Sequence, residues 1–221
     1  MLTAGPRAAR IAGRRAPIAP LQVRAGCRDR LAARSIAGPG RCSRRDAPKD
    51  ADNARVTGLA VLVDRERCHL DDAARIWAEA TAARDGDPEP LSGLELAREV
   101  LHRALDPSQE SLLLIAKGDA GEVLGFAALA PVGGAPSGRR TAELKYIGVQ
   151  PGAWGRGIGG ALLEATSSAL REEGFSHAVL EVYVDNIRAI RLYQRWGWHT
   201  TGSGYLRPSS ERIFVELALE L

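Results

Sequence analysis

The pattern of apolar and polar positions divides the chain into two parts. From about residue 55 onward, short apolar runs alternate with longer segments in which apolar residues recur every three or four positions. The short runs, bounded by Gly, Pro and Asp, predict strands, and the three-to-four spacing predicts amphipathic helices. The first fifty residues follow neither pattern. We therefore expect one folded region that begins near residue 55.

The alternation predicts the element order β-α-α-β-β-β-α-β-α-β-β. A turn of small residues at 118–121 joins the second and third strands as a hairpin. Such an order is typical of a mixed sheet flanked by helices, in the α/β (α+β) class. The predicted strands are 56–63, 111–117, 122–131, 141–149, 178–184, 198–206 and 212–220, and the predicted helices are 69–84, 94–105, 158–173 and 186–196.

Charge is distributed unevenly along the 221 residues. The whole chain has a net charge of +3, but residues 1–50 contain 12 basic and 3 acidic residues, and residues 51–221 contain 18 basic and 24 acidic residues. The basic character therefore belongs to the N-terminal segment alone. An acidic body argues against a nucleic-acid-binding domain, which usually presents a basic face.

The N-terminal segment, residues 1–54, is predicted to be a disordered basic leader. Ala and Arg make up 22 of the first 50 residues, and no aromatic residue occurs there, so little apolar surface is available to offset the entropy of ordering. Four interpretations remain open: a solvated leader without a role, upstream sequence translated from a misplaced start, a targeting peptide, and an anion-binding tail. Residues 55–221 are predicted to form one folded domain with its own core.

Composition excludes several classes of protein. No apolar run approaches the length of roughly 18–20 residues that crosses a bilayer. Cys27, Cys42 and Cys68 have neither the number nor the spacing of a disulfide framework or a zinc site, and the four His residues are scattered. We therefore expect no metal, no membrane partner and a cytoplasmic location.

A glycine-rich segment follows the strand predicted at 141–149. Gly155, Gly157, Gly159 and Gly160 lie where this strand gives way to a helix, so the backbone can turn tightly and approach a ligand closely. Free N–H groups at the helix start attract anions, and Arg156 adds a full positive charge. A glycine-rich turn alone is also typical of an ordinary loop.

Two motifs together identify a family resemblance. The segment from Glu143 to Leu163 resembles the acetyl-coenzyme A signature of the GNAT superfamily of N-acetyltransferases, with Trp154 where that motif usually has Arg or Gln. The segment 186–198 (NIRAIRLYQRWGW) is similar to the later motif of the same superfamily, in which an Asn opens a helix and Leu-Tyr and Gly-aromatic pairs follow. The resemblance covers about 165 residues, from roughly residue 55 to the end.

The resemblance implies a GNAT-like, mostly antiparallel sheet of six to seven strands with about four helices. It implies an N-acetyltransferase that moves the acetyl group of acetyl-CoA to a primary amine of a small molecule or peptide, by direct transfer in a ternary complex. A non-catalytic acyl-CoA-binding or sensing module of the same fold is the alternative. Because members of the superfamily often pair, the resemblance also allows a homodimer.

The resemblance also assigns residues to the coenzyme site. Residues 147–149 would pair with the pantetheine arm as another strand does, with Gly148 in a bulged conformation, and the 155–160 backbone would hold the diphosphate. Trp154 would act through its backbone N–H, and Asn186 would either contact the coenzyme or cap its own helix. The implied coenzyme-binding residues are Ile147, Gly148, Val149, Trp154, Gly155, Arg156, Gly157, Ile158, Gly159, Gly160 and Asn186.

Two side chains have implied catalytic roles. Tyr193 would protonate the leaving thiolate, although a tyrosine at this helical spacing is also typical of a core residue. Glu143 would be the general base, either directly or through a water, and Glu181 is the second choice; a solvated carboxylate is the alternative for Glu143. His177 and His199 are expected to be structural.

The acceptor is expected to enter between two loops. The loop after the first helix carries Asp85, Asp87 and Glu89, which would attract a cationic amine. The last hairpin carries Arg207 and Arg212, which would bind a carboxylate. These charges also fit solvated loops.

Overall fold

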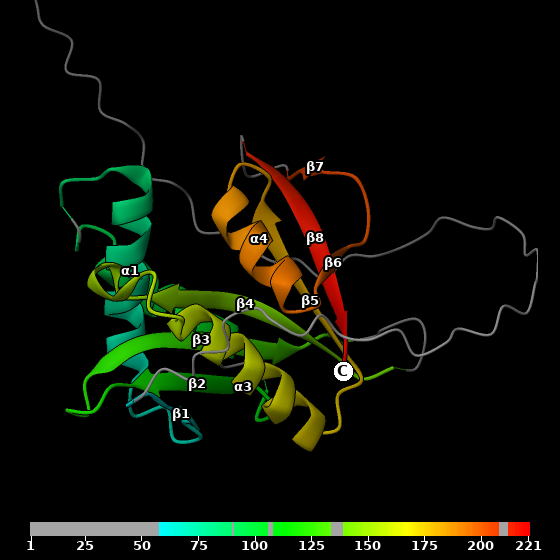
Figure 1. Cartoon of the computed structure of the whole chain (residues 1–221), viewed down its shortest axis with the longest axis horizontal. Helices are drawn as coiled ribbons and strands as arrows, with labels where there is room; N and C mark the ends of the chain where they lie inside the picture. Colours follow the sequence, from blue (N-terminus) through cyan, green and yellow to red (C-terminus); the bar gives the residue numbers. More distant parts are fainter. Residues whose placement is uncertain (1–57, 90, 106–107, 134–138, 208–211) are drawn as a thin grey trace, which may run out of the picture.

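A single mixed sheet forms the centre of the chain (Figure 1). The computed structural model describes residues 58–89, 91–105, 108–133, 139–207 and 212–221. Within them eight strands pair in the order β1-β2-β3-β4-β5-β8-β6, with β7 pairing β8 off this path. The strands are β1 (Ala60–Val63), β2 (Leu112–Lys117), β3 (Val123–Pro131), β4 (Thr141–Val149), β5 (His177–Tyr183), β6 (His199–Thr200), β7 (Tyr205–Leu206) and β8 (Ile213–Glu220); the helices are α1 (Leu70–Asp85), α2 (Leu94–Leu105), the 3-10 turn η1 (Pro151–Ala153), α3 (Ile158–Glu172) and α4 (Ile187–Arg195).

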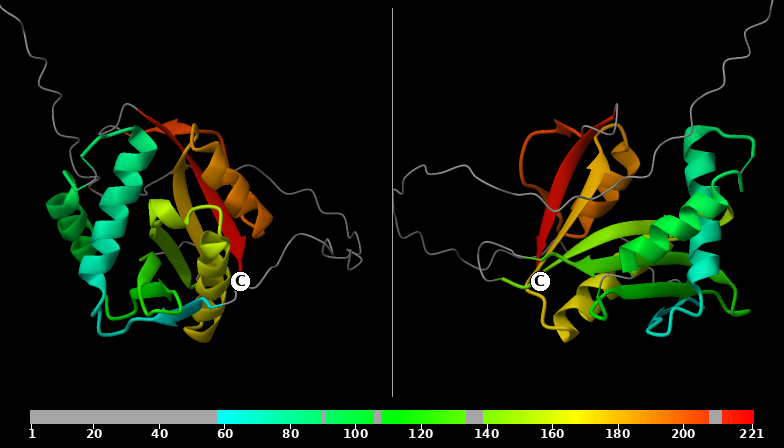
Figure 2. Two further views of the ribbon diagram at one scale, coloured as in Figure 1. Left: turned by 60° about the vertical axis from the view of Figure 1, so that its left-hand side comes forward. Right: turned by 180° about the vertical axis from the view of Figure 1, so that it is seen from behind.

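Helices cover both faces of this sheet (Figure 2). Leu112 and Leu114 of β2 pack in one core with α3 and α4, whereas Leu113 and Ile115 pack in a second core with α1 and α2. Successive side chains of a strand point to opposite faces, so a strand between two cores must be apolar at every position. This explains why β2 reads as an unbroken apolar run.

The strand β4 changes face at Lys145. Leu144 pairs with Leu129 of β3, but Tyr146 pairs with the adjacent Ala128, so Lys145 has no partner of its own and forms a bulge. A bulge of one residue reverses the alternation that follows it. Accordingly Leu144 packs in the α3 core, whereas Tyr146, two positions later, packs in the α1 core.

Strands β4 and β5 separate soon after they meet. Their parallel pairing covers only Thr141–Glu143 of β4 and His177–Val179 of β5. Beyond this point β5 continues to pair with β8 and β4 with β3, and the two strands diverge (Figure 1). In the described part of the chain, the edge of β4 from Lys145 to Val149 therefore has no partner strand on its β5 side.

The predicted fold class and element order are confirmed, with one exception. The four helices agree with prediction to within one residue at each end. The strand predicted at 198–206 is instead two short strands, β6 and β7, separated by residues 201–204, which raises the number of strands in the described residues to eight. A Cβ on Gly204 would lie 2.9 Å from the Ile213 side chain, so this stretch passes too close to β8 for a larger residue. The leader predicted at 1–54 lies outside the described residues.

Candidate active site

A tight loop joins β4 to α3. After the turn η1, Gly155 and Gly157 adopt φ of 81° and 80°, in the left-handed region that residues with a Cβ rarely enter. The loop residues 154–157 are all exposed. Two of the glycines noted in the sequence are therefore required by the backbone path of the loop.

The N-terminus of α3 is open to an anion. Gly157 is the N-cap residue and provides no side-chain cap. The first intrahelical hydrogen bond runs from the Ala161 N–H to the Gly157 carbonyl, 3.1 Å away, so the N–H groups of residues 158–160 have no partner within the helix. These N–H groups and the positive end of the helix dipole together favour a bound phosphate.

The other two glycines of the motif serve helix packing. A Cβ on Gly160 would lie 2.9 Å from the Trp196 ring, and a Cβ on Gly159 would lie 3.1 Å from the Leu192 side chain. Because neither glycine has a side chain, the start of α3 can pack closely against α4. The motif thus brings α4 next to the anion site.

Trp154 has a defined side-chain role in this loop. Its indole Nε1–H donates a hydrogen bond of 2.7 Å to the Val149 carbonyl at the end of β4. The guanidinium of Arg188, from α4, lies over the indole ring at 5.1 Å from its centroid, a cation–π distance. The residue that departs from the family motif therefore links β4, the loop and α4.

The free edge of β4 presents amide groups of alternate residues. The Gln150 N–H donates to the Leu124 carbonyl on the β3 side, at 2.9 Å. Because successive residues of a strand direct their N–H and C=O groups to opposite edges, those of Val149 and Ile147 face the β5 side, where the strands have separated. The Val149 carbonyl that Trp154 contacts is one of these groups.

Gly148 does not form the bulge expected of it. It pairs in regular register with Phe126, and the bulge lies at Lys145 instead. A Cβ on Gly148 would lie 2.6 Å from the Phe126 ring and 3.4 Å from the Ile76 side chain of α1. Glycine is needed here because strand β3 and helix α1 press on this position.

Tyr193 and Asn186 both belong to α4. Tyr193 is 7% exposed and its ring centroid lies 6.2 Å from that of Trp198. Burial raises the pKa of the Tyr193 phenol, so the group stays protonated across the neutral and mildly alkaline range. Asn186 is the N-cap of α4, where its Oδ1 accepts a hydrogen bond of 3.3 Å from the Ala189 N–H. The capping role of Asn186 is thus present in the structure.

Glu143 lies at the point where β4 and β5 part. It occupies the last rung of their parallel pairing, opposite Val179. Its carboxylate is in contact with the Lys145 ammonium, and the two side chains are only 18% and 16% exposed. Glu143 therefore stands at the mouth of the gap between the strands, with its cationic partner contributed by the bulge.

A second group of polar side chains lies near Glu143 on β5 and the β7 region. The Glu181 carboxylate accepts a hydrogen bond from the Tyr205 hydroxyl and pairs with Arg207. Burial raises the pKa of Tyr146, and the negative charge of Glu143 raises it further. The same two causes, burial and nearby carboxylates, raise the pKa of Tyr205. These residues therefore share one electrostatic environment.

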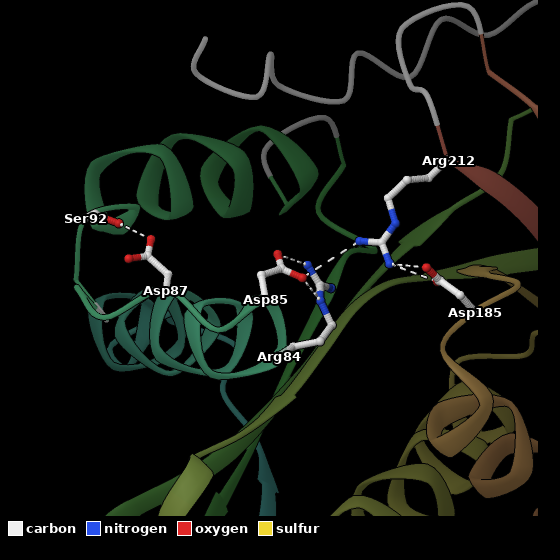
Figure 3. A network of polar contacts seen from close by, with 6 residues as sticks. All are labelled: Arg84, Asp85, Asp87, Ser92, Asp185 and Arg212. Atoms are coloured by element: carbon white, nitrogen blue, oxygen red, sulfur yellow. Dashed lines mark hydrogen bonds and ion pairs between the residues drawn. The ribbon is translucent and has the colours of Figure 1, made fainter. Parts of the chain in front are cut away.

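The two loops predicted to admit the acceptor are tied together by Arg212 (Figure 3). Its guanidinium lies 2.8 Å from both carboxylate oxygens of Asp185 and 3.8 Å from Asp85, and it covers the Tyr183 ring at 3.8 Å. The hydrogen bond from Arg84 lowers the pKa of Asp85. Asp85 is thus paired chiefly with Arg84 and Arg212 chiefly with Asp185, and the longer contact between Arg212 and Asp85 joins the two pairs.

Asp87, another acid of the first loop, also has local partners. Asp87 accepts hydrogen bonds from the Ser92 hydroxyl, at 3.1 Å, and from the backbone N–H of Glu89, at 2.9 Å (Figure 3). These contacts order the loop itself. The carboxylates of Asp85 and Asp87 thus have partners within the protein, and attraction of a cationic amine by this loop stays a prediction.

The two histidines lie away from the gap between β4 and β5. His177 begins β5, where its Nε2 is 2.6 Å from Arg139 and its Nδ1 is 3.0 Å from the Ser176 hydroxyl. His199 is exposed on the short strand β6. Over the described ranges, no group of three or more His, Cys, Asp or Glu side chains is placed to hold a metal ion, and no helix could span a membrane.

Several site residues escaped the sequence analysis. Lys145 and Tyr146 lie on the same predicted strand as Glu143, but simple alternation would place Tyr146 on the opposite face, and no sequence signal marks the bulge. Tyr205 lies in a stretch predicted as a continuous strand. Arg188 was assigned no role of its own within the second motif, because nothing in the sequence spacing indicates that it contacts Trp154.

Comparison with known proteins agrees with this geometry. A model of the acetyltransferase (GNAT) family matches residues 70–198. Mycothiol acetyltransferase of Propionibacterium freudenreichii is 34% identical over 163 residues, which cover 72% of this chain and 50% of that protein. N-acetyltransferase family 8 member 2 of Rattus norvegicus is 35% identical over 97 residues, 44% of this chain and 43% of that protein. The chain thus spans about half the length, or less, of these curated relatives.

Solved structures show the same fold. The ribosomal-protein-S18-alanine N-acetyltransferase of Escherichia coli aligns with a TM-score of 0.53 and 22% identity, over 73% of this chain and 93% of that one. A GNAT family acetyltransferase of Elizabethkingia anophelis with acetyl-CoA bound aligns with a TM-score of 0.53 and 19% identity, over 74% and 99%. Because the family model also spans more than half of its length, this chain belongs to the acetyltransferase (GNAT) family.

Proposed function

We propose that this acetyltransferase moves the acetyl group of acetyl-CoA directly to a primary amine of a small molecule or peptide, with both substrates bound together. One observation carries the proposal: the unpaired edge of β4 runs directly into the open N-terminus of α3. A strand edge suits an amide-containing arm, and a helix N-terminus suits phosphate, so the two adjoining features fit the two ends of coenzyme A.

The backbone would hold the coenzyme. The N–H groups of residues 158–160 and the left-handed loop at Gly155 and Gly157 fit a diphosphate. The amides of Ile147 and Val149 on the free edge would hydrogen-bond the pantetheine arm as a neighbouring strand does. An N–H on this edge would also stabilise the negative charge that develops on the thioester oxygen.

The acetyl transfer needs two proton movements. The nitrogen of the neutral amine attacks the thioester carbonyl carbon, so that a C–N bond forms and the C–S bond breaks. Glu143 takes the proton that the nitrogen loses, and Tyr193 donates a proton to the departing thiolate sulfur. Solvent then restores the proton to Tyr193 and receives the one held by Glu143, which balances the reaction.

The amine would bind between β4, β5 and β7. Glu143 and Glu181 supply negative charge there, and Tyr146 and Tyr205 supply aromatic surface in the same environment. Carboxylates and aromatic rings together favour an ammonium group. Arg207, paired with Glu181, would position that carboxylate.

A screen of amines tests the proposal. Purified chain, acetyl-CoA and a panel of amino acids, polyamines, amino sugars and peptides are followed by thiol release, and mass spectrometry identifies any acetylated product. We expect turnover with at least one primary amine. Tight coenzyme binding with no turnover on any amine would support the non-catalytic module instead.

Direct transfer has its own test. Intact-mass analysis of the chain after incubation with acetyl-CoA alone should show no acetylated protein, because no covalent intermediate is involved. Cys68 is an exposed thiol, so the Cys68→Ser variant serves as the control for chemical acetylation. An acetylated chain that passes its group to the amine, in both the parent and this variant, would contradict direct transfer.

A further inference from the structure

Arg188 occupies an unusual position beside the anion site. It lies in the first turn of α4, and its side chain is exposed. The guanidinium nevertheless has a defined place, over the Trp154 ring at 5.1 Å from the centroid. Trp154 is itself fixed, because its Nε1–H is bonded to the Val149 carbonyl. The cation is thus held next to Gly155, at the start of the phosphate-binding loop.

The charge of Arg188 is uncompensated in this structure. Among the described residues no carboxylate pairs with Arg188 or with Arg156, whose side chain is also exposed. Other arginines of the domain do have such partners: Arg140 pairs with Glu110, and Arg212 pairs with Asp185. Two unpaired guanidinium groups therefore flank an uncapped helix N-terminus, within a domain whose net charge is negative.

These features point to a phosphate ligand for Arg188. A guanidinium group binds phosphate oxygens through two parallel hydrogen bonds, and its planar face can stack on an aromatic ring at the same time. The stack leaves the N–H groups at the edge of the guanidinium free. Holding the side chain in advance also reduces the rotamer entropy lost on binding.

We propose that Arg188, positioned by Trp154, is a phosphate-binding residue of the coenzyme site. This inference rests on the proposed use of coenzyme A. Coenzyme A carries phosphate at two places, the diphosphate and the 3′-phosphate of the ribose, and either one offers the chemistry that Arg188 recognises. The substitution of Trp for a polar residue at position 154 is then accompanied by a cation supplied from α4.

The test measures binding rather than turnover. The dissociation constants of coenzyme A and of 3′-dephospho-coenzyme A are determined by isothermal titration calorimetry for the full chain and its Arg188→Ala variant. We expect the variant to bind coenzyme A about tenfold to a hundredfold more weakly, as for the loss of a hydrogen bond to a charged group. An equal loss with both ligands assigns the contact to the diphosphate, and a loss confined to coenzyme A assigns it to the 3′-phosphate.

A matched control separates a specific contact from general electrostatics. Arg171 is exposed and lies at the opposite end of α3, so Arg171→Ala removes the same charge far from the loop. It should leave both dissociation constants within about twofold of the parent values, since exposed charges more than a Debye length of about 10 Å away are screened. Equal losses in both variants would overturn the proposal.

The role of Trp154 is tested with Trp154→Leu and the double variant. If Trp154 positions Arg188, the tryptophan substitution weakens binding in the parent but adds little in the Arg188→Ala background. Unchanged coenzyme binding by Arg188→Ala, with normal binding by the parent, overturns this inference and leaves the proposed function intact. Failure of the parent chain to bind coenzyme A overturns the proposed function itself.

Discussion

The proposed coenzyme site (the coenzyme side) and the proposed acceptor site (the acceptor side) of this domain are formed by different kinds of polar group. On the coenzyme side, the polar groups are backbone N–H groups of the β4 edge and the start of α3. On the acceptor side they are side chains, with Glu143 beside Lys145 and Glu181 beside Arg207. The N–H groups of the first set have no partner in the sheet or in the helix, whereas the side chains of the second set are mutually paired and half-buried.

The two sides should respond differently to amino-acid substitution. A backbone N–H remains whatever side chain is present, so apart from the contact proposed for Arg188, the coenzyme side is sensitive only where a side chain would distort the path or block the approach, as at Gly155 and Gly157. A pair of charged side chains loses its function when either member is replaced, because the other is left without its partner. The coenzyme side should therefore tolerate most substitutions, and the acceptor side few.

The largest effect is expected at Glu143. Glu143→Gln keeps the size of the side chain but cannot accept the proton, so kcat/KM for the amine should fall by about 100- to 10,000-fold. Coenzyme A binding, measured by calorimetry, should be unchanged because Glu143 lies on the acceptor side. Glu181→Gln is the matched variant on β5. If only that variant abolishes the chemical step, Glu181 is the base and the assignment of Glu143 is wrong.

Tyr193 links the two sides, since it would act on the sulfur between them. Tyr193→Phe should lower kcat about a hundredfold and leave the coenzyme dissociation constant unchanged. Burial raises the pKa of this phenol, so in the parent enzyme the acid stays protonated and kcat should not decline from its ionisation up to about pH 10. Tyr183→Phe, on β5, is the control. Wild-type kcat in Tyr193→Phe would reduce Tyr193 to a core residue.

A smaller effect is expected from the loop glycines. Gly157→Ala forces a residue with a Cβ into φ of 80°, which costs about 1–2 kcal/mol, so coenzyme A should bind about tenfold more weakly. Gly152 lies in the same loop without a positive φ, and nothing would contact its Cβ within 4 Å. Gly152→Ala should therefore match the parent. Equal losses in both would mean that the loop has no special backbone geometry.

The same contrast explains what the sequence could predict. Periodicity located all four helices and the long strands, because each buries a regular set of apolar positions. The loop of the coenzyme side was recognisable from the sequence because a left-handed backbone favours glycine. Closely spaced glycines, such as Gly155 and Gly157, therefore mark this loop. Even there, the bulge was assigned to Gly148 rather than Lys145, because a bulge depends on the register with β3 and not on local composition.

The acceptor side left a much weaker signal. Glu143 and Glu181 were named, but Arg207 and Tyr205 reach Glu181 only when β5 and β7 assemble. Lys145 lies two residues from Glu143 on the same strand, at a bulge that no sequence signal marks. For the loop acids, charge alone does not reveal partners such as Arg212, which lies 3.8 Å from Asp85. Pairings between residues distant in sequence have no fixed spacing, so their geometry emerges only in the folded chain.

The smallest effect on catalysis is expected at Asp64, which lies outside both sides. Asp64 is 7% exposed and accepts hydrogen bonds from the backbone N–H groups of Cys68 and His69, at 3.1 and 2.8 Å, and it contacts the His69 ring at 2.9 Å. Burial alone would raise the pKa of Asp64, but the hydrogen bonds from His69 and Cys68 outweigh it and lower the pKa. The native state therefore favours the carboxylate at the start of α1.

Asp64→Asn should accordingly lower the free energy of unfolding by about 1–3 kcal/mol at neutral pH and leave kcat nearly unchanged. Because the native pKa is depressed, the contribution is complete above the unfolded pKa of about 3.9 and is lost as pH falls through the native value. Denaturant unfolding from pH 7 to pH 3 should thus show the two proteins converging in acid. Glu164→Gln, exposed on α3, is the control for the lost charge. If the difference in the free energy of unfolding between the two proteins is as large at pH 3 as at pH 7, ionisation of Asp64 does not account for it.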